Sequence, residues 1–242
     1  MPVKLASSSL IIVTQYRTAT DFLSAAHSHL QSKERSSNIV FAHALKRLRK
    51  EAGSALTTPR DVEDWLRFPR HRVPDDPNAF WLTIWSVDPT DNAATLDLVL
   101  SCVDWTLGNY PIFLWSPQPD DKTWLAPRIA KLTNHLLGCV PSERVFSVFG
   151  MTWLAKAFSE YWTSITGHEV EPEPFYAALL SYCTELTFID SSPQLPPSHA
   201  IRLATKSDVE SVAQLCKEFG DDSVSSFLPD CPSPRWRTFL TF

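Results

Sequence analysis

The sequence predicts an α/β fold, in which the strands of a sheet are connected by amphipathic helices. Short runs of β-branched and aromatic residues, such as FWLTIWSV at 80–87, are typical of buried strands. Longer segments with apolar residues every three or four positions, such as residues 152–166, are typical of helices that pack on a sheet. With 242 residues, of which 44% are hydrophobic, the chain is long enough to bury a large core.

The N-terminal part is predicted to be a strand followed by a helix. Residues 9–16, SLIIVTQY, are mostly β-branched or aromatic, which favours a strand. Thr18 with Asp21 three residues later is a capping pattern that begins a helix. The apolar face of this helix is predicted to contain Phe22, Ala26 and Leu30.

A second helix is predicted directly after the first. It begins near Ser36 or Ser37 and ends around Gly53, with basic residues in its last turns. Its apolar face is predicted to contain Phe41, Leu45 and Leu48.

A short third helix is predicted from Pro59 through Trp65. Thr58 is suited to the N-cap and Asp61 to the third helical position. The next segment, PRHRVPDDPN at residues 69–78, is predicted to be a loop.

Three strands are predicted in the middle of the chain. Residues 80–87 and 95–103 have strand character, and the segment DPTDN at 88–92 favours a turn, so that the two strands form a hairpin. The third strand, PIFLWS, occupies residues 111–116.

A polar loop and a helix are predicted after these strands. Pro117 and Pro119 indicate the loop, and the helix is expected at residues 128–137, where Gly138 can end it.

A short buried strand is predicted at residues 145–149, with a tight turn at Gly150. A helix then covers residues 152–166 and ends before Gly167. Its apolar side is predicted to contain Leu154, Ala157, Phe158, Tyr161 and Ile165.

The C-terminal part is predicted to contain a linker and the beginning of another domain. A last strand pair is expected between residues 175 and 189, and residues 190–198 are rich in proline and polar residues, as linkers are. Residues 201–219 have the pattern of a short strand and an amphipathic helix. The pattern decays after residue 224, so we expect a second domain that is incomplete in this chain. The alternative is that the segment packs against the first domain.

Two segments of the chain are similar to each other. When Thr18 is placed over Thr205, residues 17–26 and 204–213 share threonine, aspartate, serine and alanine in the same order. Helix beginnings of this kind are common, so two unrelated helices would also give the match. The linker before the second segment favours a repeat.

The order of these elements resembles the GNAT superfamily of acetyltransferases. The resemblance covers about residues 10–220. Residues 18–45, 143–167 and 201–219 contribute most to it. The chain is most similar to two-copy members, in which a degenerate N-terminal GNAT-like half precedes a more regular acetyl-CoA-binding half. The resemblance implies a mixed central sheet flanked by helices.

The resemblance also implies where a coenzyme would bind. GNAT members hold the coenzyme pyrophosphate with a glycine-containing loop between a central strand and a helix, where backbone N–H groups face the phosphates. The matching loop here is SPQPDDKTWLAPR at residues 116–128. It has no glycine and contains Asp120 and Asp121, so it is expected to repel pyrophosphate. The whole chain has only six glycines, where average usage would give roughly 17.

No catalytic residue is assigned from the sequence. GNAT enzymes often use a tyrosine on the last helix to protonate the leaving thiolate, and Tyr161 lies on the equivalent helix. It stands six positions before Gly167, whereas the usual spacing in the family is shorter, so a tyrosine at the edge of the core is the better interpretation. Glu160 and Glu169 are interpreted as surface carboxylates.

The sequence contains no motif typical of a metal site or of a hydrolase. The sequence has no G-x-S-x-G, Walker or H-E-x-x-H pattern. His135 and Cys139 are four residues apart on a predicted helix, but one such pair is more often structural than metal-binding, so no metal site is expected.

Nucleic-acid binding is not expected either. The formal charge is −5, and the one basic cluster is interpreted as a solvated helix face. Core packing accounts for most of the tryptophans, including Trp81, Trp85, Trp153 and Trp162. The basic cluster contains Lys46, Arg47, Arg49 and Lys50.

A cytoplasmic location is expected. The five cysteines are scattered and form no C-x-x-C pattern, which fits a reducing compartment. The apolar run near the N-terminus, residues 10–13, is too short for a signal peptide, and no segment approaches the length of a membrane span.

The sequence therefore predicts a degenerate GNAT-like domain at residues 1–189, a linker at 190–198, and the beginning of a second GNAT domain at 199–242. The resemblance implies an N-acetyltransferase that uses acetyl-CoA and acts on a small-molecule or protein amine. We expect this activity to be impaired or absent in the present chain. The alternative is a non-catalytic GNAT-like module that binds a partner.

Overall fold

The structure of the chain is a computed structural model that describes residues 9–53, 56–67, 79–105, 108–174, 176–178, 183, 188, 195–222 and 237–241. It divides into two compact units, one containing residues 1–180 and 234–242 and the other residues 181–233. The predicted loop at 69–78, most of the predicted strand pair at 175–189 and the first part of the linker at 190–198 lie outside the described residues.

The first unit contains a large sheet and the helices that pack on it. Its described elements are β1 (Leu10–Tyr16), α1 (Ala19–Gln31), α2 (Glu34–Glu51), α3 (Pro59–Arg67), β2 (Phe80–Val87), β3 (Ala94–Cys102), β4 (Asp104–Trp105), β5 (Gly108–Asn109), β6 (Ile112–Trp115), α4 (Lys122–Cys139), the 3-10 turn η1 (Ser142–Arg144), β7 (Ser147–Met151), α5 (Thr152–Thr166), β8 (Tyr176–Ala178) and β9 (Arg237–Thr241). Strands β4 and β5 form a separate small ribbon.

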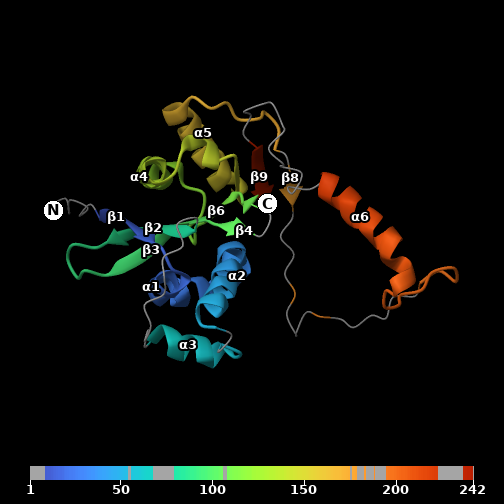
Figure 1. Ribbon diagram of the computed structural model, residues 1–242. Helices are drawn as coiled ribbons and strands as arrows, with labels where there is room; N and C mark the ends of the chain where they lie inside the picture. The colour runs from blue at the N-terminus through green and yellow to red at the C-terminus, as the bar shows by residue number, and fades with distance from the viewer. Residues whose placement is uncertain are drawn as a thin grey trace. The chain divides into compact units, whose positions relative to one another are not determined.

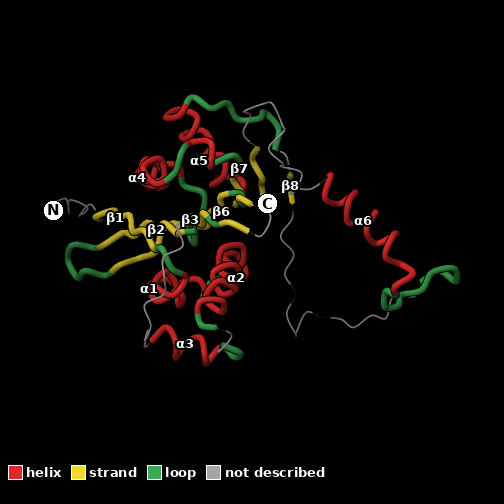
Figure 2. The backbone as a smooth tube through the Cα atoms, in the orientation of Figure 1, coloured by secondary structure: helices red, strands yellow, loops and turns green. Residues whose placement is uncertain are grey.

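The large sheet is mixed. Its seven strands lie in the order β1-β2-β3-β6-β7-β9-β8. Strands are yellow in Figure 2, where β1, β2, β3 and β6 follow one another in this order. The pairs β1–β2, β2–β3 and β3–β6 are antiparallel, whereas β6–β7, β7–β9 and β8–β9 are parallel. The α/β class and the mixed sheet predicted from the sequence are thus confirmed.

Helices cover both faces of this sheet. Helices α1, α2 and α3 lie on one face, and α4 and α5 lie on the other (Figure 1). Alternating residues of the central strands serve the two cores: Leu82 of β2 packs toward α4 and α5, and its neighbour Trp81 packs toward α1 and α2. Both side chains are completely buried.

The predicted helix caps are confirmed. The Thr18 hydroxyl accepts a hydrogen bond from the Asp21 backbone N–H at 3.0 Å, and α1 begins at the next residue after Thr18. At the start of α3, the Asp61 carboxylate accepts a hydrogen bond from the Thr58 backbone N–H at 2.7 Å, so Thr58 and Asp61 form the predicted cap of this helix. In both helices a local hydrogen bond fixes where the helix begins.

Helix α4 differs from its prediction. It begins at Lys122, six residues before the expected start, and continues through Gly138 to Cys139. Pro117 and Pro119, which indicated the loop, do lie before the helix, but Pro127 lies inside it. Burial of Leu125 and Ile129 against the sheet stabilises the helix enough to offset the poor helix propensity of proline.

Gly150 is also placed differently from the prediction. It is not in a tight turn but within β7, and its φ is not positive. A Cβ atom on Gly150 would lie 2.9 Å from the carbonyl oxygen of Leu114 in β6. The residue is glycine because two strands approach closely there.

The second unit contains the turn η2 (Lys206–Asp208) and the helix α6 (Val209–Asp222). The predicted helix is confirmed, and the Thr205 backbone N–H donates to the Asp208 carboxylate at 2.7 Å. The predicted strand before it is absent, because residues 201–205 form no strand and the Ile201 and Leu203 side chains are 78% and 91% exposed.

Strand β9 lies in the range 199–242 that the sequence assigned to a second domain. It pairs instead with β7 and β8 of the first unit, with Val148 opposite Thr238. A segment this short and this far along the chain from its partners carries no local signal of where it pairs.

Candidate functional site

The candidate site lies where two parallel strands end. Strands β6 and β7 are paired through Ile112 with Val148 and Phe113 with Phe149. Each is followed by a helix, α4 after a short loop and α5 immediately. In α/β sheets, ligands commonly bind outside the carboxyl ends of parallel strands, where the following helices leave a crevice.

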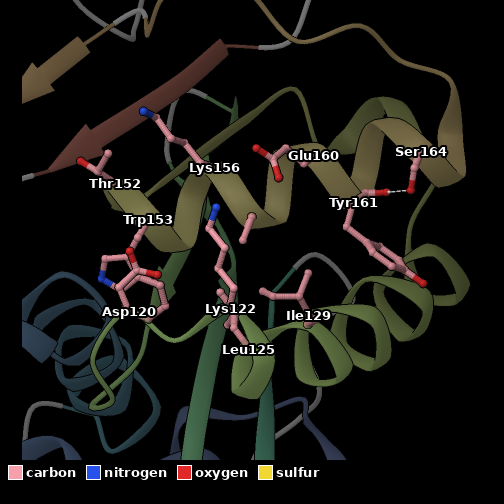
Figure 3. A pocket seen from close by; sticks show the side chains of 12 residues that line it. Asp120, Lys122, Leu125, Ile129, Thr152, Trp153, Lys156, Glu160, Tyr161 and Ser164 are labelled. Carbon is pink, nitrogen blue, oxygen red and sulfur yellow. Dashed lines mark hydrogen bonds between the residues drawn. The ribbon is translucent and has the colours of Figure 1, made fainter.

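A cleft of about 720 Å³ lies between α4 and α5 at this position. This volume is in the range of small-molecule sites. Its apolar wall includes Leu125 and Ile129 of α4, which are almost completely buried. The full lining is Asp120, Lys122, Leu125, Ala126, Ile129, Thr152, Trp153, Lys156, Ala157, Glu160, Tyr161 and Ser164, and Figure 3 shows how these side chains lie.

The charged side chains of the cleft are of both signs. Lys122 extends from α4 toward α5, and Asp120 lies beside Trp153 at the same end of the cleft in the view of Figure 3. Lys156 and Glu160 extend from the side of α5 that is turned away from α4 in that view. None of these four groups forms an ion pair with another described residue.

A second cleft, of about 630 Å³, adjoins α5 on this other side. Lys156 and Glu160 line it as well as the first cleft, together with Val170 and Glu171 of the segment after α5. Lys156 and Glu160, the two exposed charged residues of α5, therefore line both clefts.

The N-terminus of α4 is occupied by a carboxylate of the chain itself. The Asp121 side chain accepts hydrogen bonds from the backbone N–H groups of Thr123, at 2.9 Å, and Trp124, at 3.1 Å. In the preceding loop, the Gln118 N–H donates to the Ser116 hydroxyl. Two of the backbone donors that an anion would use at this helix N-terminus therefore already have a partner, and the adjacent Asp120 adds negative charge.

A buried ion pair fixes the first half of α4 to the sheet. The Arg128 Nε donates to Asp97 Oδ2 at 2.7 Å, and the two side chains are 10% and 2% exposed. Arg128 also donates to the Ser86 hydroxyl and stacks on the Trp124 ring at 4.1 Å. The β2–β3 register shifts between Ile84 and Trp85, so that Asp97 of β3 has no residue opposite it in β2. A bulge of this kind redirects a side chain, here toward α4.

Tyr161 lies at the edge of the core, as predicted, and also lines the cleft. Its ring packs against the core under α4 and α5, and its hydroxyl accepts a hydrogen bond from Asn134 of α4 at 3.2 Å. Glu160 and Glu169 are exposed, in agreement with their interpretation as surface carboxylates. Neither carboxylate has a hydrogen-bonded partner among the described residues.

His135 and Cys139 lie four residues apart on α4, as the sequence predicted. Among the described residues, no group of three or more histidine, cysteine, aspartate or glutamate side chains is arranged to hold a metal ion. The Cys139 thiol lies 3.6 Å from the Gln15 side-chain amide. Burial raises the pKa of Cys102 to about 11 and also raises the pKa of Cys139, so neither thiol is activated as a nucleophile.

The four tryptophans considered for nucleic-acid binding pack in the core or against it. Trp81 and Trp162 are buried and Trp85 and Trp153 half-buried, which confirms their packing role. The basic cluster lies on α2, where Lys46, Arg49 and Lys50 are exposed and Arg47 is half-buried.

Sequence reasoning missed the cleft itself and the role of Asp121. Pro117 and Pro119 indicated a loop, and the helix was expected only from residue 128, whereas it begins at Lys122. The signal that could have found it is the aspartate directly before KTWL, since aspartate is a preferred N-cap.

Comparison with protein families, with curated proteins and with solved structures found no match for this chain. No helix in the part of the chain that the structure describes has the length and apolar character of a membrane span.

Proposed function

We propose that the first unit is a GNAT-like domain that acts as a non-catalytic binding module. The observation that carries this proposal is that the Asp121 carboxylate accepts hydrogen bonds from the Thr123 and Trp124 backbone N–H groups at the N-terminus of α4. A pyrophosphate would have to displace this cap and lie next to Asp120. The α4–α5 cleft remains available to a ligand without that anchor.

The GNAT-like assignment is supported by the order of the elements. The sequence resemblance implies a strand, two helices, a group of strands, and then alternating helices and strands around a mixed sheet. The order from β1 to α5 and the mixed sheet agree with this expectation, apart from the additional helix α3 and the β4–β5 ribbon.

The second candidate is an acetyl-CoA-dependent N-acetyltransferase that acts on a small-molecule or protein amine. It is favoured by the position of the cleft after two parallel strands and by the Tyr161 hydroxyl on its wall. A tyrosine in this position can protonate a leaving thiolate.

A cytoplasmic location is part of this proposal. It is supported by the four described cysteines, which are all free thiols.

Thiol release and thermal stability separate the two candidates. The chain is incubated with acetyl-CoA and a panel of primary amines, including peptide N-termini, and free coenzyme A is measured with a thiol reagent. A binding module gives no amine-dependent release above a blank that contains the protein without the amine, and millimolar acetyl-CoA leaves Tm unchanged because it does not bind the folded state. A saturable rise in Tm together with amine-dependent thiol release would establish the acetyltransferase instead.

A further inference from the structure

We infer that the α4–α5 cleft binds a small zwitterion with an apolar body, of the class of apolar α-amino acids. This inference rests on the proposed function, because it assumes that coenzyme does not fill the cleft. It adds the chemical class of the ligand, which the proposed function leaves open.

The charged end of the cleft carries one group of each sign. Asp120 precedes α4, Lys122 is its first residue, and both line the cleft. Neither forms an ion pair with any described residue, and the neighbouring Asp121 is committed to the helix cap. A carboxylate and an ammonium that do not pair with each other are complementary to a ligand that carries both charges.

Ligands with a single charge fit this end less well. A monoanion would meet Lys122 but would lie close to Asp120 and to the Asp121 carboxylate. A simple amine would meet Asp120 but would lie beside the Lys122 ammonium. An α-amino acid carries its ammonium and its carboxylate on one carbon, so each can face the opposite charge of the cleft.

The rest of the cleft is suited to an apolar side chain. Leu125 and Ile129 form the wall on α4, and Trp153 and Ala157 form part of the wall on α5. These four residues belong to or pack against the core between the helices and the sheet, so the walls are fixed before a ligand binds. An aliphatic or aromatic side chain would therefore replace water against a preformed apolar surface.

Three probes of similar shape test the inference on the full chain: L-phenylalanine, phenethylamine and 3-phenylpropionate. Ligand-observed NMR titrations at neutral pH give the dissociation constants. L-phenylalanine is expected to bind at least about threefold more tightly than either probe with one charge, since an exposed ion pair contributes a few-fold in affinity. Equal or tighter binding of a single-charge probe, or no binding of any probe, would overturn the inference.

Two variants test whether Asp120 and Lys122 contribute the charges that the ligand meets. Asp120→Asn is expected to reduce the preference for L-phenylalanine over 3-phenylpropionate to about one, and Lys122→Gln is expected to do the same against phenethylamine. The matched controls are Glu34→Gln, on α2, and Lys33→Gln, directly before it, which are exposed and not part of the cleft lining. If the controls change the preferences as much as the cleft variants do, binding is elsewhere and the inference fails.

Failure of this inference can be distinguished from failure of the proposed function. Acetyl-CoA is titrated into the same protein sample in a separate experiment. Acetyl-CoA binding together with amine-dependent thiol release would refute the binding-module proposal whatever the three probes do. Absence of zwitterion preference without acetyl-CoA binding would refute only the ligand class.

Discussion

Arg128 and Asp97 lie almost out of contact with solvent, so the loss of either side chain leaves a buried charge without its partner. We expect Arg128→Met to lower the free energy of unfolding by about 3–5 kcal/mol, because Asp97 would keep its desolvation cost without the ion pair. Urea denaturation measures this difference.

A matched control is available in the second unit. Arg202 forms an ion pair with Asp208 at 2.7 Å, but its side chain is 61% exposed. Arg202→Met is expected to leave the denaturation curve unchanged, since water screens such a pair. The double variant Asp97→Leu with Arg128→Met should lose less stability than Arg128→Met alone, and a larger loss would contradict this account of the pair.

Histidine protonation is expected to make the fold sensitive to acid. Burial lowers the pKa of His43, with Lys46 and Arg47 acting in the same direction, and burial also lowers the pKa of His27. The folded state then binds fewer protons than the unfolded state below the usual pKa of 6.5. The free energy of unfolding should therefore be largest above that pH and fall as the pH is lowered through it.

His43→Gln tests the cause of this pH dependence. The variant should lose less stability between pH 7 and pH 5 than the parent protein, because one protonation that opposes folding has been removed. Thermal unfolding followed at several pH values gives the comparison. An identical slope in both proteins would show that His43 does not contribute.

At the scale of elements, the contact between β6 and β7 depends on Gly150. Gly150→Ala would place a Cβ atom 2.9 Å from the Leu114 carbonyl oxygen and 3.1 Å from its Cβ, so the strands would have to move apart. We expect a loss of about 1–3 kcal/mol in the free energy of unfolding.

Gly138→Ala in α4 is the matched control, because a Cβ there meets nothing within 4 Å. Alanine favours the helix, so this variant should be neutral or more stable by up to about 1 kcal/mol. Equal losses in both variants, measured by urea denaturation, would contradict the close-approach explanation.

The elements differ in how well the sequence predicted them. Helix α5 was predicted at its observed residues because its apolar periodicity and Gly167, which has a φ of 75° in the left-handed region, define both ends. Helix α4 was predicted eight residues too short, six at its start and two at its end, because Pro117 and Pro119 indicated a loop and Gly138 a helix end. The bulge that turns Asp97 toward Arg128 could not be predicted, because it depends on the register between two strands.

The candidate site was predicted only in part. The absence of glycine and the presence of Asp120 and Asp121 predict a loop unsuited to pyrophosphate, and this stays a prediction. The cleft, by contrast, is formed by residues of two helices that lie more than twenty positions apart in the sequence, such as Leu125 and Trp153. Their proximity follows from the parallel pairing of β6 and β7, which no local pattern encodes.

At the scale of the whole molecule, α6 should be much less stable than the helices of the first unit. Its apolar residues Val209, Val212 and Leu215 are 63%, 44% and 64% exposed, and a helix of this length is marginal in water without packing. Hydrogen exchange is expected to be fast at residues 209–218 and slow in α4 and α5. Protection of 209–218 equal to that of α5 would show that α6 packs against a partner surface.

Calorimetric titration of the chain with acetyl-CoA tests the central claim most directly. The claim is that the Asp121 cap and the adjacent Asp120 leave no anchor for pyrophosphate at the N-terminus of α4. The account predicts weak or undetectable binding. A dissociation constant in the low micromolar range with a stoichiometry near one would contradict it.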